Sequence, residues 1–141
     1  MNITKRPYRL LSDFVAVHNF LTKTYTLKEQ NSYLLPQFFE YAHTHPWFNH
    51  KLTHRSTVWE ENNEIVAFCC FEMNIGEAYL VTKNGYNFLL SEMLEQAERE
   101  LFTEKKGVKS LAVWIVDTQQ EHLTLLKNSS YKKVHTEPVR I

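Results

Sequence analysis

Residues 64–102 read EIVAFCCFEMNIGEAYLVTKNGYNFLLSEMLEQAERELF, and this stretch decides the fold. The apolar, β-branched and aromatic run 65–71 predicts a strand, Asn74-Ile75-Gly76 predicts a turn, and residues 78–81 predict a second strand. A helix is predicted to follow after the short segment 82–87. A loop between a strand and a helix is typical of sites where backbone N–H groups bind phosphate at a helix N-terminus.

The helix that follows this loop has a regular apolar face. Its apolar side chains recur every three or four positions, at Leu89, Leu90, Met93, Leu94, Ala97 and Leu101. Glu92, Glu95, Glu98 and Arg99 lie between them and predict a solvent-exposed face. We expect the helix to end at Lys105-Lys106-Gly107, because cations suit the C-terminal end of the helix dipole and glycine suits a left-handed cap.

Length and composition limit what the chain can be. We expect one domain over residues 1–141, because this length is sufficient for a single core. The 16 basic and 16 acidic residues cancel, so there is no overall field to attract nucleic acid or an anionic membrane. No segment resembles a signal peptide or reaches the roughly 18 apolar residues that span a bilayer. We therefore expect a cytoplasmic protein without nucleic-acid or membrane partners.

The first third of the chain predicts two helices. Residues 8–11 read as a short extended opening, and Ser12 is predicted to cap a helix over residues 13–25. Pro36 suits the first turn of a second helix. That helix must end near His45-Pro46, because the residue before a proline avoids the helical region.

The middle of the chain predicts a β-hairpin. Residues 49–53 are expected to be irregular, and residues 55–60 read as a strand. Glu61-Asn62-Asn63-Glu64 then predicts a tight turn, because asparagine tolerates positive φ and the apolar run 65–71 follows directly. The two neighbouring cysteines of that run, Cys69 and Cys70, are interpreted as buried free thiols.

The last third predicts one strand, one helix and a final extended segment. Residues 111–116 are apolar at successive positions, as expected for a strand covered by helices on both faces of a sheet. Thr118-Gln119-Gln120-Glu121 has the pattern of a capping box and predicts a short helix through Leu126. Residues 132–141 are expected to be extended.

This order of elements is that of one known superfamily. The segments that carry the likeness are Arg6-Pro7-Tyr8-Arg9 with Asp13-Phe14, Phe39-Glu40-Tyr41-Ala42-His43-Thr44-His45-Pro46, Val58-Trp59-Glu60-Glu61-Asn62-Asn63-Glu64-Ile65-Val66-Ala67, Phe71-Glu72, Gly76-Glu77-Ala78 and Glu92-Met93-Leu94-Glu95-Gln96-Ala97-Glu98. Over nearly its whole length the chain resembles the GCN5-related N-acetyltransferase (GNAT) superfamily, and within it the amino-terminal domain of bacterial tandem GNAT proteins.

The resemblance implies a fold and a ligand. It implies an α+β fold of three layers (α/β/α), with helices on both faces of a mixed, mostly antiparallel sheet that splays open between its fourth and fifth strands. Acetyl-CoA, as co-substrate, would lie in that opening. The residues implied to contact it are Tyr79, Leu80 and Val81 of the fourth strand and Lys83, Asn84, Gly85, Tyr86 and Asn87 of the loop.

Two segments depart from the family pattern. A GNAT loop reads Arg/Gln-x-x-Gly-x-Gly/Ala, whereas this chain has Val81 at the basic position and Asn84 and Tyr86 at the two small ones. Lys83 could supply part of the missing charge. The tyrosine that protonates the leaving thiolate in many GNATs is replaced by Leu126, upstream of the pair Ser130-Tyr131.

Glu72 and Glu77 are the candidate catalytic residues. They flank the turn at Gly76, and a carboxylate beside a cleft can act as general base through a water when burial raises its pKa. The alternative is a pair of solvated turn residues. We rank Glu72 first because it follows the apolar Phe71 at a strand end.

Four histidines, His43, His45, His50 and His54, are close enough in sequence to suggest a metal site. No cysteine lies near them, and His43 and His45 would point apart on a helix. We therefore predict no metal, and interpret these histidines as surface, helix-end or interdomain residues.

Three hypotheses follow. The first is a GNAT-type N-acetyltransferase domain that transfers acetyl from acetyl-CoA to a small-molecule or peptide amine. The second is a non-catalytic module of the same fold that binds a small ligand or a partner, such as a second GNAT domain or a second copy of the chain. The third is a metal sensor that uses the histidines.

Overall fold

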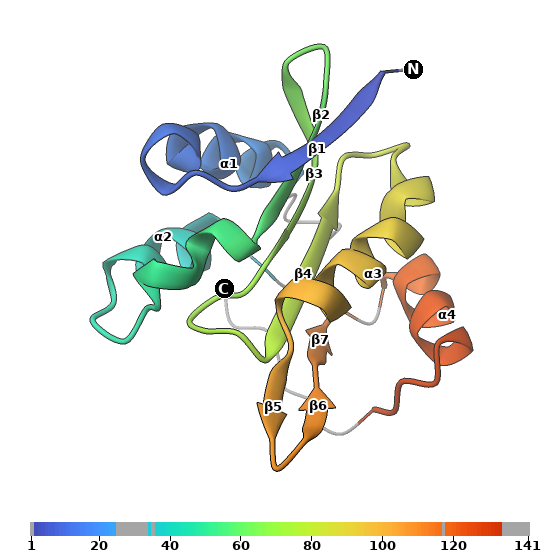
Figure 1. Ribbon diagram of the computed structural model, residues 1–141. Helices are drawn as coiled ribbons and strands as arrows, with labels where there is room; N and C mark the ends of the chain where they lie inside the picture. Colours follow the sequence, from blue (N-terminus) through green and yellow to red (C-terminus); the bar gives the residue numbers. More distant parts are fainter. Residues whose placement is uncertain (1, 25–33, 35, 117, 134–141) are drawn as a thin grey trace.

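The computed structural model describes residues 2–24, 34, 36–116 and 118–133. Its elements are, in chain order, β1 (Ile3–Pro7), α1 (Leu10–Thr24), α2 (Pro36–Thr44), the 3-10 helix η1 (His50–Arg55), β2 (Thr57–Glu61), β3 (Glu64–Cys70), β4 (Glu77–Thr82), the 3-10 helix η2 (Asn87–Leu89), α3 (Leu90–Glu100), β5 (Thr103–Lys105), β6 (Val108–Ser110), β7 (Ala112–Trp114) and α4 (Gln120–Asn128) (Figure 1).

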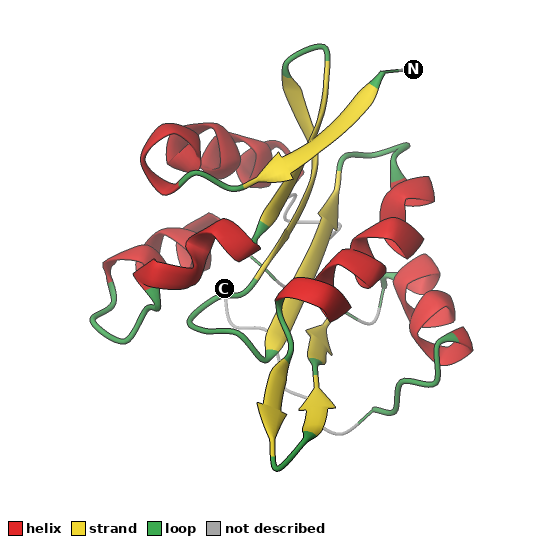
Figure 2. Ribbon diagram, in the orientation of Figure 1, coloured by secondary structure: helices red, strands yellow, loops and turns green. Residues whose placement is uncertain are grey.

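A mixed sheet forms the centre of the molecule. Its strand order is β1-β2-β3-β4-β7, in which the first four strands pair antiparallel and β7 pairs parallel to β4. A separate two-stranded sheet, β5-β6, extends from one end of the main sheet (Figure 2). These observations confirm the predicted α+β class and the mixed, mostly antiparallel sheet.

The β2–β3 hairpin forms as predicted. Asn62 and Asn63 form its two-residue turn with φ values of 53° and 63°. Positive φ at both central residues belongs to a type I′ turn, whose twist matches that of the flanking strands. The run that follows is β3, with six buried residues in succession.

Side chains on the two faces of the sheet enter two apolar clusters. One cluster combines Trp59, Cys69 and Leu80 with the apolar face of α3, and the other combines Val58, Phe68 and Val81 with α1 and α2. Figure 1 shows α1 and α2 together on one side and α3 and α4 on the other. Both faces of the sheet therefore pack against helices, while the strict three-layer arrangement stays a prediction.

The N-terminal elements begin earlier than predicted. Residues 3–7, not 8–11, form the first strand, and α1 begins at Leu10, so Ser12 lies inside the helix and is not its cap. The reason is Asp13, whose carboxylate accepts the backbone N–H of Arg9 at 2.7 Å and thus satisfies a donor of the first turn. The predicted end of α1 at Tyr25 lies outside the described residues. The predicted bounds of α2 are confirmed.

The segment after α3 is a second hairpin and not a longer helix. The prediction that the helix ends at Lys105-Lys106-Gly107 was wrong, because α3 ends at Glu100. Lys106 and Gly107 instead form the turn between β5 and β6, with φ values of 52° and 79°. The left-handed conformation was expected there, but it turns a β-ribbon and caps no helix.

Several smaller predictions also need correction. Residues 50–55 form η1, where irregular chain was expected over residues 49–53, and the predicted strand 55–60 begins instead at Thr57, as β2. The predicted strand 111–116 shortens to β7, which is half-exposed because it is an edge strand paired only with β4. The residue before α4 is Gln119 and not Thr118, and the Gln119 side chain makes no cap bond, so the helix begins one residue later than the predicted capping box implies. Most of the final segment, residues 134–141, lies outside the described residues.

Candidate functional site

The sheet opens between β4 and β7. Their parallel register joins Glu77 to Ala112, Ala78 to Val113 and Tyr79 to Trp114, and stops there, although β4 continues to Thr82. The resemblance implied a sheet that splays at this place, between its fourth and fifth strands. The second half of β4 therefore has β3 on one side and no described pairing with β7 on the other.

Side chains at the start of α4 replace the next step of the ladder. Ala112 N–H donates to the Gly76 carbonyl at 3.0 Å, and the register continued along both strands would join Val116 N–H to the Leu80 carbonyl. Instead, Val116 N–H donates to Gln119 Oε1 at 2.8 Å. The Leu80 carbonyl lies 3.0 Å from His122 Nε2.

The chemistry of these groups fixes their roles. A carbonyl oxygen can only accept, so His122 Nε2 carries a proton and donates it to Leu80. His122 is 5% exposed, and burial lowers its pKa, although the bond to Leu80 opposes this shift. Gln119 is also buried and lies beside His122, with the two Nε2 atoms 3.3 Å apart. The Val116 N–H and the Leu80 carbonyl are thus satisfied by the side chains of Gln119, the residue before α4, and His122, in its first turn.

The loop 82–87 is held closely against the β2–β3 hairpin. Lys83 N–H donates to the Val66 carbonyl at 2.8 Å, and Lys83 Nζ donates to Glu64 Oε1 at 2.9 Å. The Tyr86 hydroxyl donates to Glu61, and the hydroxyl of Thr82 donates to Asn87. The ion pair raises the pKa of Lys83 and lowers that of Glu64. The loop's cation therefore already has a carboxylate partner.

The predicted cofactor residues differ in what they offer a ligand. Tyr79, Leu80 and Val81 are buried side chains, so only their backbone could contact an acyl arm. Val81 in particular belongs to the apolar cluster below α1 and supplies no charge. Asn84 and Gly85 are exposed, and Gly85 has φ of 91°, with open space where a Cβ would stand. Both residues are therefore accessible to a ligand at the tip of the loop.

An open cavity of about 1070 Å³ is lined by residues of this loop, of α4 and of α1. Its lining includes Lys83, Asn84 and Asn87 from the loop, Gln119 just before α4, and His122 from α4. The α1 residues Asn19, Phe20, Lys23 and Thr24 also line it. The cavity therefore combines the predicted loop with two residues at the start of α4 that the sequence did not single out.

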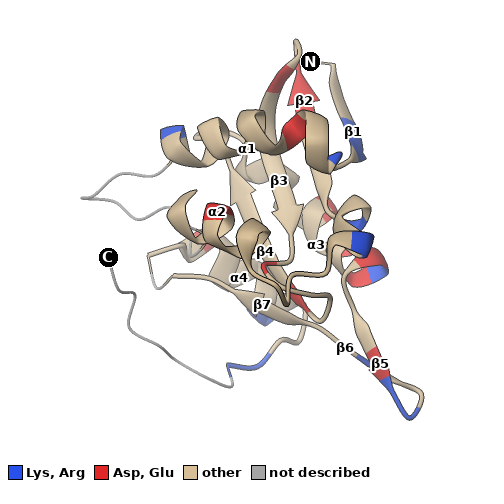
Figure 3. Cartoon of the chain, turned by 90° about the vertical axis from the view of Figure 1, so that its left-hand side faces the viewer, with Lys and Arg blue, Asp and Glu red and all other residues tan. Residues whose placement is uncertain are grey.

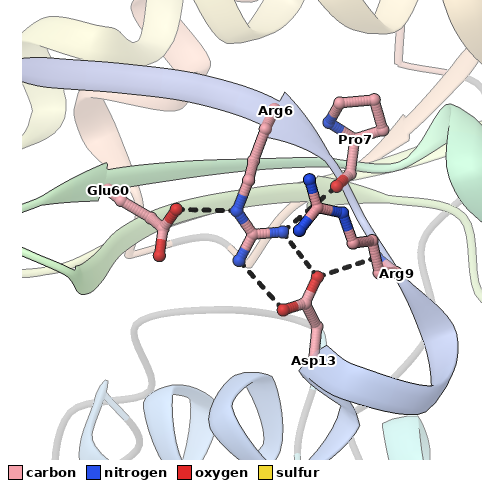
Figure 4. A network of polar contacts seen from close by, with 5 residues as sticks. All are labelled: Arg6, Pro7, Arg9, Asp13 and Glu60. Carbon is pink, nitrogen blue, oxygen red and sulfur yellow. Dashed lines mark hydrogen bonds and ion pairs between the residues drawn. The ribbon is translucent and has the colours of Figure 1, made fainter.

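Arg6 lies at the wall of this cavity but is fully engaged. Its guanidinium donates to both oxygens of Asp13, at 2.6 and 2.9 Å, and through Nε to Glu60 at 2.7 Å (Figure 4). Burial would raise the pKa of Asp13, but the bonds from Arg6 and Arg9 hold it below its usual value. This network ties β1, β2 and α1 together and leaves Arg6 no free charge for an anionic ligand.

Glu72 and Glu77 lie together at the start of β4, the end opposite the loop. Glu77 Oε1 accepts the backbone N–H groups of Glu72 at 3.0 Å and of Met73 at 3.1 Å. Glu72 is half-buried, and burial, together with the charge of Glu77, raises its pKa to about 7. The structure thus assigns different roles to the two carboxylates: Glu77 holds the connection between β3 and β4, and Glu72 is poised to exchange a proton near neutral pH.

The C-terminal departure from the family pattern has a structural role. Leu126 is buried against the α3 side of the sheet, so its position holds no general acid. Ser130 has φ of 68°, the conformation that glycine usually adopts after a helix. The Tyr131 hydroxyl donates to Glu98 at 3.1 Å, and burial raises the pKa of this tyrosine.

In the structure, the histidines considered as a possible metal site take part in packing and hydrogen bonds. His43 Nδ1 donates to the Phe39 carbonyl at 2.9 Å, so its Nε2 accepts the Tyr8 hydroxyl at 3.0 Å. Burial lowers the pKa of His43. Among the described residues, no three His, Cys, Asp or Glu side chains are placed to hold a metal ion.

Two residues of the site were not predicted from the sequence. Gln119 was assigned only to a capping box and His122 to no role, because their partners, Val116 and Leu80, depend on where β7 diverges from β4. The one available signal was the pair of polar residues three apart at the beginning of an otherwise apolar helix face.

Comparison with known proteins adds no assignment: no model of a protein family matches the chain, and no curated protein matches it. Within the described part of the chain, no helix is long and apolar enough to cross a bilayer. Charged residues of both signs are spread over several elements, with lysines at the tip of the β5–β6 hairpin and mainly carboxylates on α3 (Figure 3).

Proposed function

We propose that this chain is a GNAT-type N-acetyltransferase domain that transfers acetyl from acetyl-CoA to an amine of a small molecule or peptide. The observation that carries the proposal is the opening of the parallel pair β4–β7 after Tyr79 and Trp114. A sheet that opens at a parallel pair offers backbone donors and acceptors to an extended ligand. The strand order of the main sheet supports the same proposal.

The arrangement gives the two ends of β4 different tasks. The acyl arm would run along the open edge of β4, and the phosphates would lie at the loop tip, near the amides of Asn84 and Gly85. The amine would react toward the opposite end, where Glu72 lies. With a pKa of about 7, Glu72 is partly ionised at neutral pH and can accept a proton from the ammonium form of the acceptor through a water.

Glu77 acts as a positioning residue in this scheme. Its carboxylate fixes the two backbone amides at 72 and 73, and its charge keeps the pKa of Glu72 high. The amine nitrogen then attacks the thioester carbonyl, the C–S bond breaks, and the sulfur leaves as thiolate. The nitrogen loses its second proton through solvent to that thiolate, which gives the amide and free CoA. Backbone amides of β4 would stabilise the oxyanion that forms on the carbonyl.

A specific observation favours a second candidate, a non-catalytic module of the same fold. Lys83 and Tyr86 of the loop are bonded to Glu64 and Glu61, and His122 occupies the Leu80 carbonyl. A ligand would have to compete with these bonds. The two candidates differ in whether acetyl transfer occurs, and the second requires only ligand or partner binding.

The test measures binding and transfer separately. Acetyl-CoA is titrated into the full chain by calorimetry, and release of free CoA is followed with a panel of small amines and peptides. Glu72→Gln should leave the Kd within about twofold of wild type and lower kcat by about 10²- to 10⁴-fold, the usual contribution of a general base. Glu95→Gln, on the exposed face of α3, is the matched control and should change neither.

The outcomes are distinct. Binding without transfer to any amine supports the non-catalytic module. Absence of binding at millimolar acetyl-CoA, with no rise in Tm, contradicts both the cofactor and the proposed activity, since a ligand of the native state must stabilise it.

A further inference from the structure

The start of α4 does more than pack against the sheet. Its side chains supply both bonds that the missing β4–β7 step would have made: Gln119 to the Val116 N–H and His122 to the Leu80 carbonyl. These two backbone groups are buried, so leaving them unpaired would cost free energy. In this structure, therefore, both backbone groups at the place where β4 and β7 separate are hydrogen-bonded.

We propose that Gln119 and His122 form a latch on the open edge of β4, which must be released before the acyl arm of the ligand can pair with Leu80. This regulatory role rests on the proposed function, because it concerns the site where acetyl-CoA would lie. The latch competes directly with the ligand, since His122 and a ligand donor cannot both occupy the same lobe of the Leu80 carbonyl at hydrogen-bond distance.

The surrounding structure allows α4 to move without unfolding the core. Among the described residues of α4, Leu126 is the only buried apolar one, while Leu125 is partly buried. By contrast, β3 buries six of its seven residues. The first turn of α4 also borders the cavity, so released side chains have space to turn into. Local opening of α4 should thus cost less than global unfolding.

A latch lowers apparent affinity by the fraction of molecules in which it is closed. Removing the imidazole donor should therefore tighten binding of acetyl-CoA. For His122→Ala we expect a Kd about fivefold lower than that of wild type, the equivalent of one net hydrogen bond. The same variant should have a lower Tm without ligand, because the Leu80 carbonyl loses its partner. Opposite changes in affinity and stability are the signature of a latch.

Two control variants separate this from a general effect on the helix. Thr124→Ala changes an exposed residue one half-turn away and should alter neither Kd nor Tm appreciably. His122→Gln keeps an amide donor on the same helix face and should stay closer to wild type than His122→Ala in both measurements. If His122→Ala binds acetyl-CoA as weakly as wild type or more weakly, the latch is wrong and His122 is structural or contacts the ligand.

Amide hydrogen exchange tests the latch without any ligand. The Val116 N–H should exchange through local opening, faster than the β3 amides that exchange only on global unfolding, and Gln119→Ala, which removes its acceptor, should accelerate Val116 about fivefold further. Exchange of Val116 at the global rate in wild type would overturn the latch. If exchange behaves as expected but no variant binds acetyl-CoA, the proposed function is wrong. The latch is then still supported, and the ligand that pairs with this edge of β4 is a different one.

Discussion

At the residue scale, Glu72 links the candidate chemistry to stability. Its pKa in the folded chain is about 7, raised by burial and by Glu77, against an ordinary value near 4.5. Between these two values the folded chain binds more protons at Glu72 than the unfolded chain does. The contribution of Glu72 to stability is therefore greatest at low pH and is lost as pH rises through 7.

Replacing Glu72 by glutamine should remove this dependence. We expect Glu72→Gln to be more stable than wild type at pH 8, by about 1 kcal/mol after allowing for the solvent that still reaches this half-buried side chain, and nearly equal at pH 4.5. Denaturant titrations at both pH values provide the measurement. An equal difference at both would show that Glu72 is not perturbed in the folded chain.

The pH dependence of stability from His43 should be opposite to that from Glu72. Burial lowers its pKa below the ordinary 6.5, so the neutral form is favoured in the folded chain, where Nε2 accepts the Tyr8 hydroxyl. Its contribution to stability is present above pH 6.5 and is lost as pH falls below that value. Tyr8→Phe, which removes the hydroxyl, should cost about 1 kcal/mol at pH 7.5 and less at pH 5, measured by urea unfolding. A cost that does not change with pH would refute this role for His43.

At the element scale, helices, strands and turns that depend on residues close in sequence were predicted, whereas features that depend on contacts between distant residues were missed. The order β3, turn, β4, loop and α3 was predicted because the spacing of apolar residues and the turn residues are local signals. The β2–β3 hairpin was predicted from Asn62-Asn63 for the same reason. The β5–β6 hairpin was missed because its lysines and Gly107 also suit a helix end. Of the candidate site, the loop and the Glu72–Glu77 pair were predicted, whereas Gln119 and His122 depend on contacts across the sheet.

Gly76 lies just before β4 and is bonded to the ends of two other elements, α3 and β7. Its N–H donates to the Leu101 carbonyl after α3, and its carbonyl accepts Ala112 N–H at the start of β7. A Cβ at Gly76 would lie 2.8 Å from Thr103 Cγ2, and φ is +105°. Gly76→Ala should therefore destabilise the chain by about 2–3 kcal/mol in urea titrations, through both backbone strain and overpacking.

Gly85 provides the matched control. Its φ of +91° is also unfavourable for alanine, but a Cβ there meets nothing within 4 Å. Gly85→Ala should cost only about 1 kcal/mol. Thr103→Ser, which removes Cγ2, should recover part of the loss in Gly76→Ala. Equal costs at the two glycines, or no recovery, would show that the contact with Thr103 does not determine the role of Gly76.

At the scale of the whole molecule, the structure divides into a well-packed sheet with α1, α2 and α3 and a less buried margin formed by β7 and α4. The candidate site lies along this margin, where local opening is least costly. The exposed Leu11, Val15, Tyr41 and Trp47 lie on or next to α1 and α2. Contact of these residues with a second GNAT domain or a second copy of the chain stays a proposal.

The central claim is that acetyl-CoA binds along the open edge of β4. A ¹H–¹⁵N correlation spectrum recorded during titration with acetyl-CoA tests it most directly. We expect chemical-shift changes concentrated at the amides of residues 80–87, 116 and 119–122, with the β5–β6 hairpin unchanged as an internal control. No change at millimolar acetyl-CoA, or changes centred away from β4 and α4, would contradict the account.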